Sequence, residues 1–328
     1  MLVVIKVVFL RYSTKEQQST TMIDLSKFNS LFALTAYFDT EAKCRKVLKE
    51  QRWGDYVVCP YCGCVECVER KDGKYRCHGC GSNFTVLVGT IFENTKLPLR
   101  KWFMAMYLIS SHKKGISSVQ LAQDIQVTQK TAWFILHKIR HLYGQTVDKL
   151  GGKVECDEMY LGGKETNKHE SKKVEGTQGR STKTKTPIFG MVEREGEVKA
   201  LTVPNTKEKT LMPIIKQYVY EHSEIFTDEL SSYSKLAENG YTHSIVHHYQ
   251  KEYVVGEAYT NTIEGFWAEF RRMVYGIYHF VSKKYLQRYL DEEVYRWNTK
   301  EADAGVRFAY MFGMCVGVFD YEMVRCVA

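Results

Sequence analysis

The chain has 328 residues, of which 44% are hydrophobic and 26% charged, and its formal net charge is +8 at pH 7. This length excludes a single small module and leaves room for two or three folded units with the ordinary composition of globular proteins. No apolar run reaches the roughly 18 residues that a membrane-spanning helix needs, so the sequence predicts no membrane partner. The positive charge is compatible with a polyanionic partner but does not establish one.

The first ten residues, "MLVVIKVVFL", resemble the apolar core of a signal peptide only in part. Lys6 interrupts the run, and no cleavage site of small residues follows it. We therefore interpret residues 1–21 as a non-native or disordered leader, with Met22 as a candidate start. Residues 22–56 are predicted to form a short helical lead.

Six of the ten cysteines lie between Cys59 and Cys80. In a chain without a secretory signal, such clustering indicates metal binding and not a disulfide framework. Two Cys-x-x-Cys pairs occur in the mirrored segments "CPYCG" and "CHGCG", and their thiolates suit a tetrahedral zinc ion. The predicted ligands are Cys59, Cys62, Cys77 and Cys80. Four thiolates leave no position for water, which favours a structural role for the zinc.

The segment between these pairs contains Asp72-Gly73 flanked by alternating residues, a pattern typical of a β-hairpin. Residues 57–96 are therefore predicted to form a zinc ribbon. Cys64 and Cys67 are left over, and they remain an alternative ligand pair.

Residues 97–148 are predicted to be helical and to contain a helix-turn-helix. Apolar residues at helical spacing occur on both sides of a short break, and Thr128 is a suitable N-cap for the second helix. That helix is expected to present a mixture of side chains suited to base edges and phosphates, namely Gln129, Lys130, Thr131, Phe134 and Lys138. The alternative is an ordinary helical hairpin, because this pattern is common.

From residue 150 the pattern changes to short β-like runs, "VECDEMYL", "PIFGMVERE" and "VKALTVP", followed by the helix "EKTLMPIIKQYVYEH" and the strand "EIFTDEL". Residues 150–300 are therefore predicted to form a mixed α/β domain with flanking helices. The polar segment 163–186 interrupts it and is predicted to be a loop. This loop is either a solvated insertion or a phosphate-contacting segment, through Lys172, Lys173 and Arg180.

Three acids are the candidate catalytic residues of this domain. Asp157 lies in the first β-run, Asp228 ends another, and Glu264 belongs to a helix that begins near Thr260. The buried stripe of this helix is predicted to comprise Ile263, Phe266, Trp267, Phe270 and Val274. Asn261, Glu264 and Arg271 fall together on a neighbouring face, because three and seven residues are about one and two turns.

Glu155 and Glu158 flank Asp157 on the same strand. Glu155 points to the same side as Asp157, because side chains alternate along a strand, and is expected to support it. Glu158 points to the opposite side and is expected to play no part.

Clustered carboxylates repel one another unless a cation neutralises them, and their hard oxygen atoms suit Mg²⁺ or Mn²⁺. Two such ions about 4 Å apart can activate an attacking oxygen and stabilise the leaving oxygen of a phosphodiester. The acids therefore predict nuclease or strand-transfer chemistry. An alternative is that they are exposed acids at strand ends, which are common.

The segments "VECDEMYLGGKE" and "NTIEGFWAEFRRMVYGIYHFVSKKYLQRYLDEEVYRWNT" resemble the DDE-type insertion-sequence transposases that carry an N-terminal zinc ribbon, known as insertion-sequence family fifteen ninety-five. The resemblance covers roughly residues 25–320. It implies a zinc ribbon, a helix-turn-helix that binds terminal inverted repeats, and a ribonuclease-H-like domain that cuts and joins double-stranded DNA.

The resemblance also implies roles for single residues. Asp157, Asp228 and Glu264 would hold two magnesium or manganese ions, and Arg271 takes the place of a basic residue two turns after the third acid. Asn261 is the alternative third residue. His247 and His248 are either site residues or ordinary packed or surface histidines.

The reaction requires two DNA ends to be held together, so the mechanism predicts a homodimer or larger assembly. The protein would act with its DNA in the cytoplasm, or in the nucleus of a eukaryotic host. Residues 301–328 are unusually apolar and are interpreted as a C-terminal packing tail. The rival functions are a non-catalytic zinc-ribbon regulator that binds DNA and a metal-dependent nuclease that does not join strands.

Overall fold

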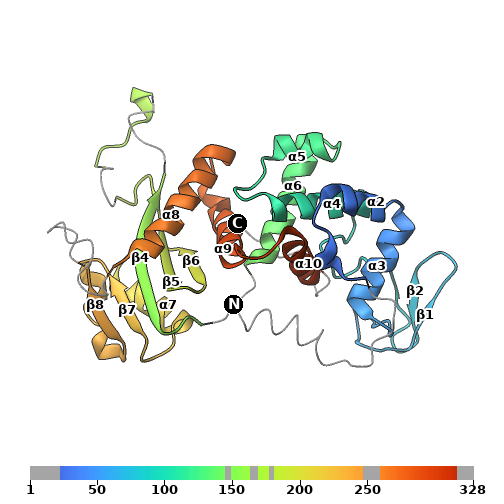
Figure 1. Cartoon of the computed structure of the whole chain (residues 1–328), viewed down its shortest axis with the longest axis horizontal. Helices are drawn as coiled ribbons and strands as arrows, with labels where there is room; N and C mark the ends of the chain where they lie inside the picture. The colour runs from blue at the N-terminus through green and yellow to red at the C-terminus, as the bar shows by residue number, and fades with distance from the viewer. Residues whose placement is uncertain (1–22, 145–148, 163–168, 177–180, 247–258, 316–328) are drawn as a thin grey trace. The chain divides into compact units, whose positions relative to one another are not determined.

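A computed structural model describes residues 23–144, 149–162, 169–176, 181–246 and 259–315. The predicted leader, Arg180, His247 and His248 lie outside these residues. The chain divides into two compact units (Figure 1). We call residues 145–298 the sheet unit, and the preceding chain together with residues 299 onward the helical unit. Within the described residues, no helix is both long and apolar enough to cross a membrane.

The sheet unit is built on a mixed five-stranded sheet in the order β6-β5-β4-β7-β8. Neighbours β4, β5 and β6 pair antiparallel, whereas β7 and β8 run parallel to β4. The strands are β4 (Lys153–Leu161), β5 (Thr186–Glu193), β6 (Val198–Thr202), β7 (Glu224–Thr227) and β8 (Thr242–Ile245). This arrangement agrees with the mixed α/β class that the sequence predicts, and strands β4 to β7 fall within predicted β-like runs or beside them.

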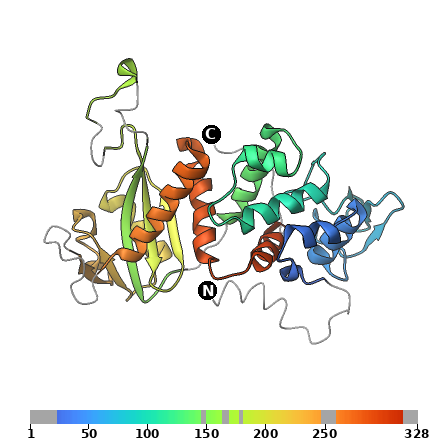
Figure 2. The same cartoon turned by 45° about the horizontal axis from the view of Figure 1, so that its top comes forward.

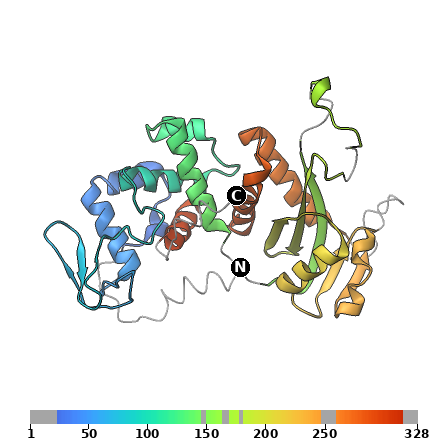
Figure 3. The same cartoon turned by 180° about the vertical axis from the view of Figure 1, so that it is seen from behind.

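Helices cover both faces of this sheet (Figure 1 and Figure 3). Alternate residues of β4 and β5, such as Met159 and Ile188, pack against α8 (Asn261–Met273) and α9 (Leu286–Asn298). The intervening residues, such as Cys156 and Phe189, pack against α7 (Glu208–Tyr218). Because strand side chains alternate between faces, Glu155 and Asp157 belong to the α8 face of β4. Short helical turns span Glu170–Lys172, Ser231–Tyr233, Ala237–Asn239, Val274–Tyr278 and Lys283–Tyr285.

Two amide side chains of α9 occupy the outer edge of β6. Gln287 accepts from the backbone N–H of Thr202 at 2.7 Å and donates to the carbonyl of Ala200 at 3.2 Å. Asn298 accepts from the N–H of Val198 at 2.8 Å and donates to its carbonyl at 3.2 Å. These amides replace a neighbouring strand, which protects an edge that could otherwise pair with another chain.

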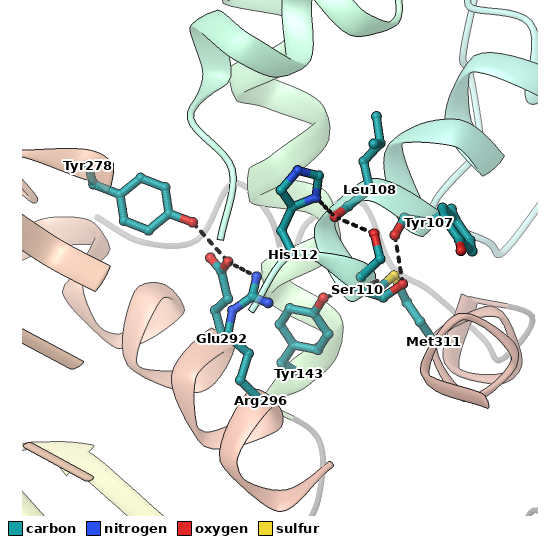
Figure 4. Close-up of polar contacts among 10 residues, drawn as sticks. Tyr107, Leu108, Ser110, His112, Tyr143, Tyr278, Glu292, Arg296 and Met311 are labelled. Atoms are coloured by element: carbon teal, nitrogen blue, oxygen red, sulfur yellow. Dashed lines mark hydrogen bonds and ion pairs between the residues drawn. The ribbon is translucent and has the colours of Figure 1, made fainter. Parts of the chain in front are cut away.

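The helical unit is held together by aromatic side chains from distant parts of the sequence. Phe103 packs against Phe38 and against Phe312, each with ring centroids 5.0 Å apart. Figure 2 shows the last helix of the chain beside helices from its first third. The helices are α2 (Leu31–Tyr37), α3 (Glu41–Trp53), α4 (Leu99–Ser111), α5 (Ser118–Asp124), α6 (Gln129–Tyr143) and α10 (Ala304–Cys315), after a short turn at Leu25–Lys27. Tyr143 also contacts Met311, with the hydroxyl 4.0 Å from the sulfur (Figure 4). Residues 304–315 of the predicted tail thus form a helix packed into this core.

A three-stranded antiparallel ribbon follows α3. Its strands are β1 (Cys67–Glu69), β2 (Tyr75–Cys77) and β3 (Asn83–Phe84). The predicted turn at Asp72-Gly73 joins β1 to β2, and Gly73 adopts a φ of 74°, which a residue with a Cβ rarely does. Trp53 at the end of α3 packs edge-on against Tyr75 of β2, with centroids 5.2 Å apart.

Candidate functional site

The register of two parallel strands brings Asp157 and Asp228 together. Glu155 of β4 pairs with Phe226 of β7. Continuing that register by two residues places Asp157 opposite Asp228, immediately after the end of β7. Carboxylate oxygens of the two residues lie within 4.8 Å of each other, which is close enough for a shared cation.

Glu158 also belongs to this group, although its position on the opposite face of β4 predicted no part for it. One of its oxygens lies within 4.8 Å of those of Asp157 and Asp228, and it accepts a hydrogen bond from buried Tyr233. Strand β7 ends at Thr227, so the adjacent edge of β4 has no neighbour there. The longer glutamate side chain can therefore reach this edge from the opposite face. Strict alternation along a strand does not predict such a contact.

Helix α8 carries the third predicted acid. The predicted stripe of Ile263, Phe266, Trp267, Phe270 and Val274 is buried, as expected. Asn261, Glu264 and Arg271 are all exposed on this helix. Glu264 is not among the acids whose oxygens lie within 4.8 Å of one another, but its charge contributes to raising the pKa of Asp157.

The pKa of Asp157 is raised from 3.8 to about 6, mainly because the carboxyl group is removed from water and in smaller part because of the negative charges of Asp228 and Glu264. Opposing this effect, the indole Nε1–H of Trp267 donates to the Asp157 carboxylate at 2.9 Å. A half-buried carboxylate among like charges is the environment in which a divalent cation supplies the missing positive charge.

Gly190 makes this indole contact possible. It pairs with Asp157 across β4 and β5, and a Cβ at this position would lie 2.5 Å from the ring of Trp267. The absence of a side chain lets the indole lie directly on the sheet. Neither residue was predicted to support the acids, although a glycine within an apolar strand is a recognised sign of close approach.

The four predicted zinc ligands converge. The sulfur atoms of Cys59, Cys62, Cys77 and Cys80 all lie within 4.8 Å of one another. Equivalent backbone hydrogen bonds close the two Cys-x-x-Cys turns. The N–H of Gly63 donates to the carbonyl of Cys59, and the N–H of Gly81 donates to the carbonyl of Cys77, both at 3.0 Å. Cys64 and Cys67 are outside this group, so the geometry favours the predicted outer four.

The two helices predicted as a helix-turn-helix are α5 and α6, separated by a short turn in which Gln126 adopts a φ of 53°. Thr128 caps α6 as predicted, accepting from the N–H of Thr131 at 3.2 Å. Gln129 and Lys130 are exposed at the start of α6. The side-chain amide of Gln129 donates to Ser118 of α5 at 2.8 Å, so this residue also joins the two helices.

Lys138 does not face outward, and this part of the prediction was wrong. The side chain is only 2% exposed, and its Nζ donates to the carbonyl of Ile91 at 2.8 Å. Its ammonium group lies near the rings of Trp102 and Phe134. Eight helical residues beyond Lys130 amount to a rotation of about 80°, which is enough to turn the side chain towards the core.

Two other basic residues predicted to contact phosphate are exposed in the segment after β4. Lys172 ends a short helical turn, and Lys173 forms an ion pair with Glu170 at 2.5 Å. Both are therefore accessible to a ligand.

Comparisons with known proteins agree with this architecture. Residues 149–298 match the ISXO2-like transposase domain, and residues 39–83 match the transposase zinc-ribbon domain. The chain is 29% identical over 282 residues to a protein in transposable element ISH50 of Halobacterium salinarum, covering 81% of this chain and 95% of that protein. It is 30% identical over 105 residues to a transposase-like protein of Haemophilus influenzae, covering 32% of this chain and 84% of that protein.

Among solved structures, the Mos1 strand transfer complex aligns with a TM-score of 0.27 and 13% identity, over 67% of this chain and 76% of that one. A pre-cleavage Mos1 transpososome aligns with a TM-score of 0.25 and 11% identity, over 92% of this chain and all of that one. Similarity this weak supports no argument. The domain matches, with the four-cysteine ribbon and the mixed sheet, define a DNA transposase. The chain belongs to the IS1595 family of DDE transposases, which combine this catalytic domain with a zinc ribbon.

Proposed function

We propose that this transposase binds terminal inverted repeats and catalyses metal-dependent cleavage of DNA strands and their transfer to a target. The observation that carries the proposal is the gathering of Asp157, in the middle of β4, and Asp228, directly after β7, beside a helix that presents Glu264. Family membership supports a transposition role, and the clustered acids support a catalytic one.

The oxygens of Asp157 and Asp228 fit shared divalent cations, because they lie within 4.8 Å of each other and the pKa of half-buried Asp157 is raised. We propose Glu264 as the third acid, with Asn261 one turn earlier as the alternative. Two Mg²⁺ or Mn²⁺ ions bound there would supply activation of the attacking oxygen and stabilisation of the leaving oxygen.

The chain's own residues would prepare this site. The hydrogen bond from Trp267 fixes one oxygen of Asp157. Glu158 adds negative charge and is itself held by Tyr233. Arg271, exposed near the end of α8, offers a guanidinium group to a DNA phosphate.

We assign DNA recognition to the helical unit and to the basic segment after β4. Lys130 and Thr131 lie at the start of α6, where a recognition helix contacts base edges. Lys172 and Lys173 are proposed to contact phosphates, and Arg180 is assigned the same role from the sequence alone. Joining two DNA ends requires at least two copies of the protein, so the proposed active form is a dimer or larger assembly.

The test is a cleavage assay with the purified protein, Mg²⁺ or Mn²⁺, and end-labelled DNA that carries candidate terminal repeats. We expect metal-dependent nicking at the repeat end and then joined products, both lost in Asp157→Asn. The variant matches the native residue in size, so its loss of activity would report the missing charge.

The same assay separates the rival functions. Sequence-specific binding without nicking in either metal would contradict catalysis and favour a regulatory protein. Nicking without joined products would favour a nuclease. Comparing Glu264→Gln with Asn261→Ala identifies the third residue, because only its replacement is expected to abolish nicking.

A further inference from the structure

Helix α8 begins without a cap of its own. Thr260 occupies the N-cap position, but its side chain makes no capping hydrogen bond. Instead, the backbone N–H groups of Thr262 and Ile263 donate to one carboxylate oxygen of Glu155, at 2.9 and 3.0 Å. The hydroxyl of Thr262 donates to the other oxygen at 3.0 Å. A fully buried carboxylate on β4 therefore satisfies the free donors at the positive end of the helix.

Arg194 holds this carboxylate from the other side. Its Nε lies 2.9 Å from Glu155, and its Nη2 donates to the carbonyl of Tyr259 at 2.7 Å. The guanidinium group lies over the rings of Phe226 and Tyr259, with its carbon 3.9 and 3.6 Å from their centroids. Arg194 thus contacts β7 and the residue that leads into α8, in addition to Glu155.

These contacts stand in a regular relation to the predicted acids. Glu155 lies two residues before Asp157 on β4, and Phe226 lies two residues before Asp228. Thr262 lies two residues before Glu264 on α8. The ion pair between Glu155 and Arg194 therefore joins the three elements that carry the acids, and it does so two residues before each acid.

We propose that Glu155 and Arg194 form a positioning clamp that fixes β4, β7 and α8 relative to one another, so that their acids keep the geometry needed for metal binding and reaction. The inference rests on the proposed function, but neither clamp residue is one of the acids proposed to hold the metal. Loss of a residue that holds metal ligands in place typically lowers metal affinity or activity on the order of 10- to 100-fold. The competing explanation is a buried ion pair that only stabilises the fold.

Another buried ion pair in the same unit provides a matched control. Glu292 of α9 is fully buried, pairs with Arg296 at 2.5 Å and accepts from the hydroxyl of Tyr278 at 2.8 Å (Figure 4). It therefore resembles Glu155 in burial and pairing, but its partners Arg296 and Tyr278 lie outside β4, β7 and α8. Glu292→Gln is expected to lower stability without changing the metal requirement.

The experiment compares full-length native protein, Glu155→Gln and Glu292→Gln at a temperature where thermal unfolding shows all three folded. We measure the single-turnover nicking rate at saturating DNA, the DNA dissociation constant, Mn²⁺ affinity by electron paramagnetic resonance, and amide exchange of residues 259–267. For Glu155→Gln we expect the nicking rate or Mn²⁺ affinity to fall on the order of 10- to 100-fold. We also expect unchanged DNA affinity, faster exchange at the start of α8, and partial rescue of nicking by high Mn²⁺.

The clamp is overturned if Glu155→Gln and Glu292→Gln match in nicking rate, Mn²⁺ affinity and exchange of α8. If the native protein does not nick DNA at all, the proposed function fails. Mn²⁺ affinity and amide exchange then still decide whether the clamp positions the acids. If Glu155→Gln does not fold, Arg194→Lys replaces it, because lysine keeps the charge but loses the planar contacts to both rings; native values for this variant also overturn the clamp.

Discussion

Asp157 is the residue at which folding and chemistry conflict most directly. A strand covered by a helix favours an apolar side chain, yet this position holds a carboxylate whose pKa is raised to about 6, chiefly by burial. The indole of Trp267 and the absence of a side chain at Gly190 accommodate that carboxylate. The site is therefore prepared for a cation at some expense to the stability of the metal-free protein.

The raised pKa predicts a pH-dependent metal affinity. Metal binds the ionised carboxylate, so below pH 6 a proton competes with the ion and apparent affinity falls by up to about tenfold per pH unit. In the metal-free protein the same shift makes the free energy of unfolding fall as pH rises from 3.8 to about 6, because the unfolded chain releases its proton first. Mn²⁺ titrations between pH 5 and pH 8 test the first effect, with Asp157→Asn as the control. An affinity that does not change between pH 5 and pH 7 would contradict the assignment of Asp157 as a ligand.

At the scale of elements, α6 combines an exposed start with a buried middle. Lys130 is exposed, whereas the Nζ of Lys138 is bound to the carbonyl of Ile91 and burial lowers its pKa to about 8. The two lysines are thus expected to differ in function although they share one helix.

Lys130→Ala is expected to weaken binding to repeat DNA and to reduce the magnitude of the slope of log affinity against log salt by about 1, the effect of losing one phosphate contact. Lys138→Met keeps most of the aliphatic stem and is expected to leave that slope unchanged. Fluorescence anisotropy with labelled DNA over a range of salt concentrations measures both. Equal slopes for Lys130→Ala and the native protein would place DNA contacts elsewhere.

The spacing of apolar residues predicts the helices and strands, but it does not predict which side chains of different elements contact each other. The buried stripe of α8 and the Thr128 cap follow from local spacing, so the sequence contains them directly. The cap that Glu155 supplies to Thr262 joins positions more than a hundred residues apart, and no local pattern predicts it. Glu158 lies on the predicted face of β4, but its long side chain reaches the acids around the edge of the strand, which a face assignment does not predict. Lys138 was assigned to the wrong side of α6, because its position along the helix turns it towards the core.

At the scale of the whole molecule, the chain divides into two compact units. The ribbon's own apolar cluster is small and centres on Cys59, Tyr75, Cys77 and Phe84. Such a module depends on its metal for stability, because binding energy for a structural zinc is also folding energy. The sheet unit, in contrast, has extensive apolar cores on both faces of its sheet.

Removal of zinc is therefore expected to unfold the ribbon and leave the sheet unit folded. Hydrogen exchange followed by mass spectrometry should show lost protection over residues 57–84 after treatment with a strong chelator, and unchanged protection in β4, β5 and α8. Cys77→Ser should lose one equivalent of bound zinc and reproduce this pattern, whereas Cys64→Ser should keep both its zinc and its protection, because its sulfur lies outside the four-thiolate group. Equal zinc loss in the two variants would show that the surplus cysteines take part in binding, and loss of protection in β4 on chelation would show that the two units do not fold independently.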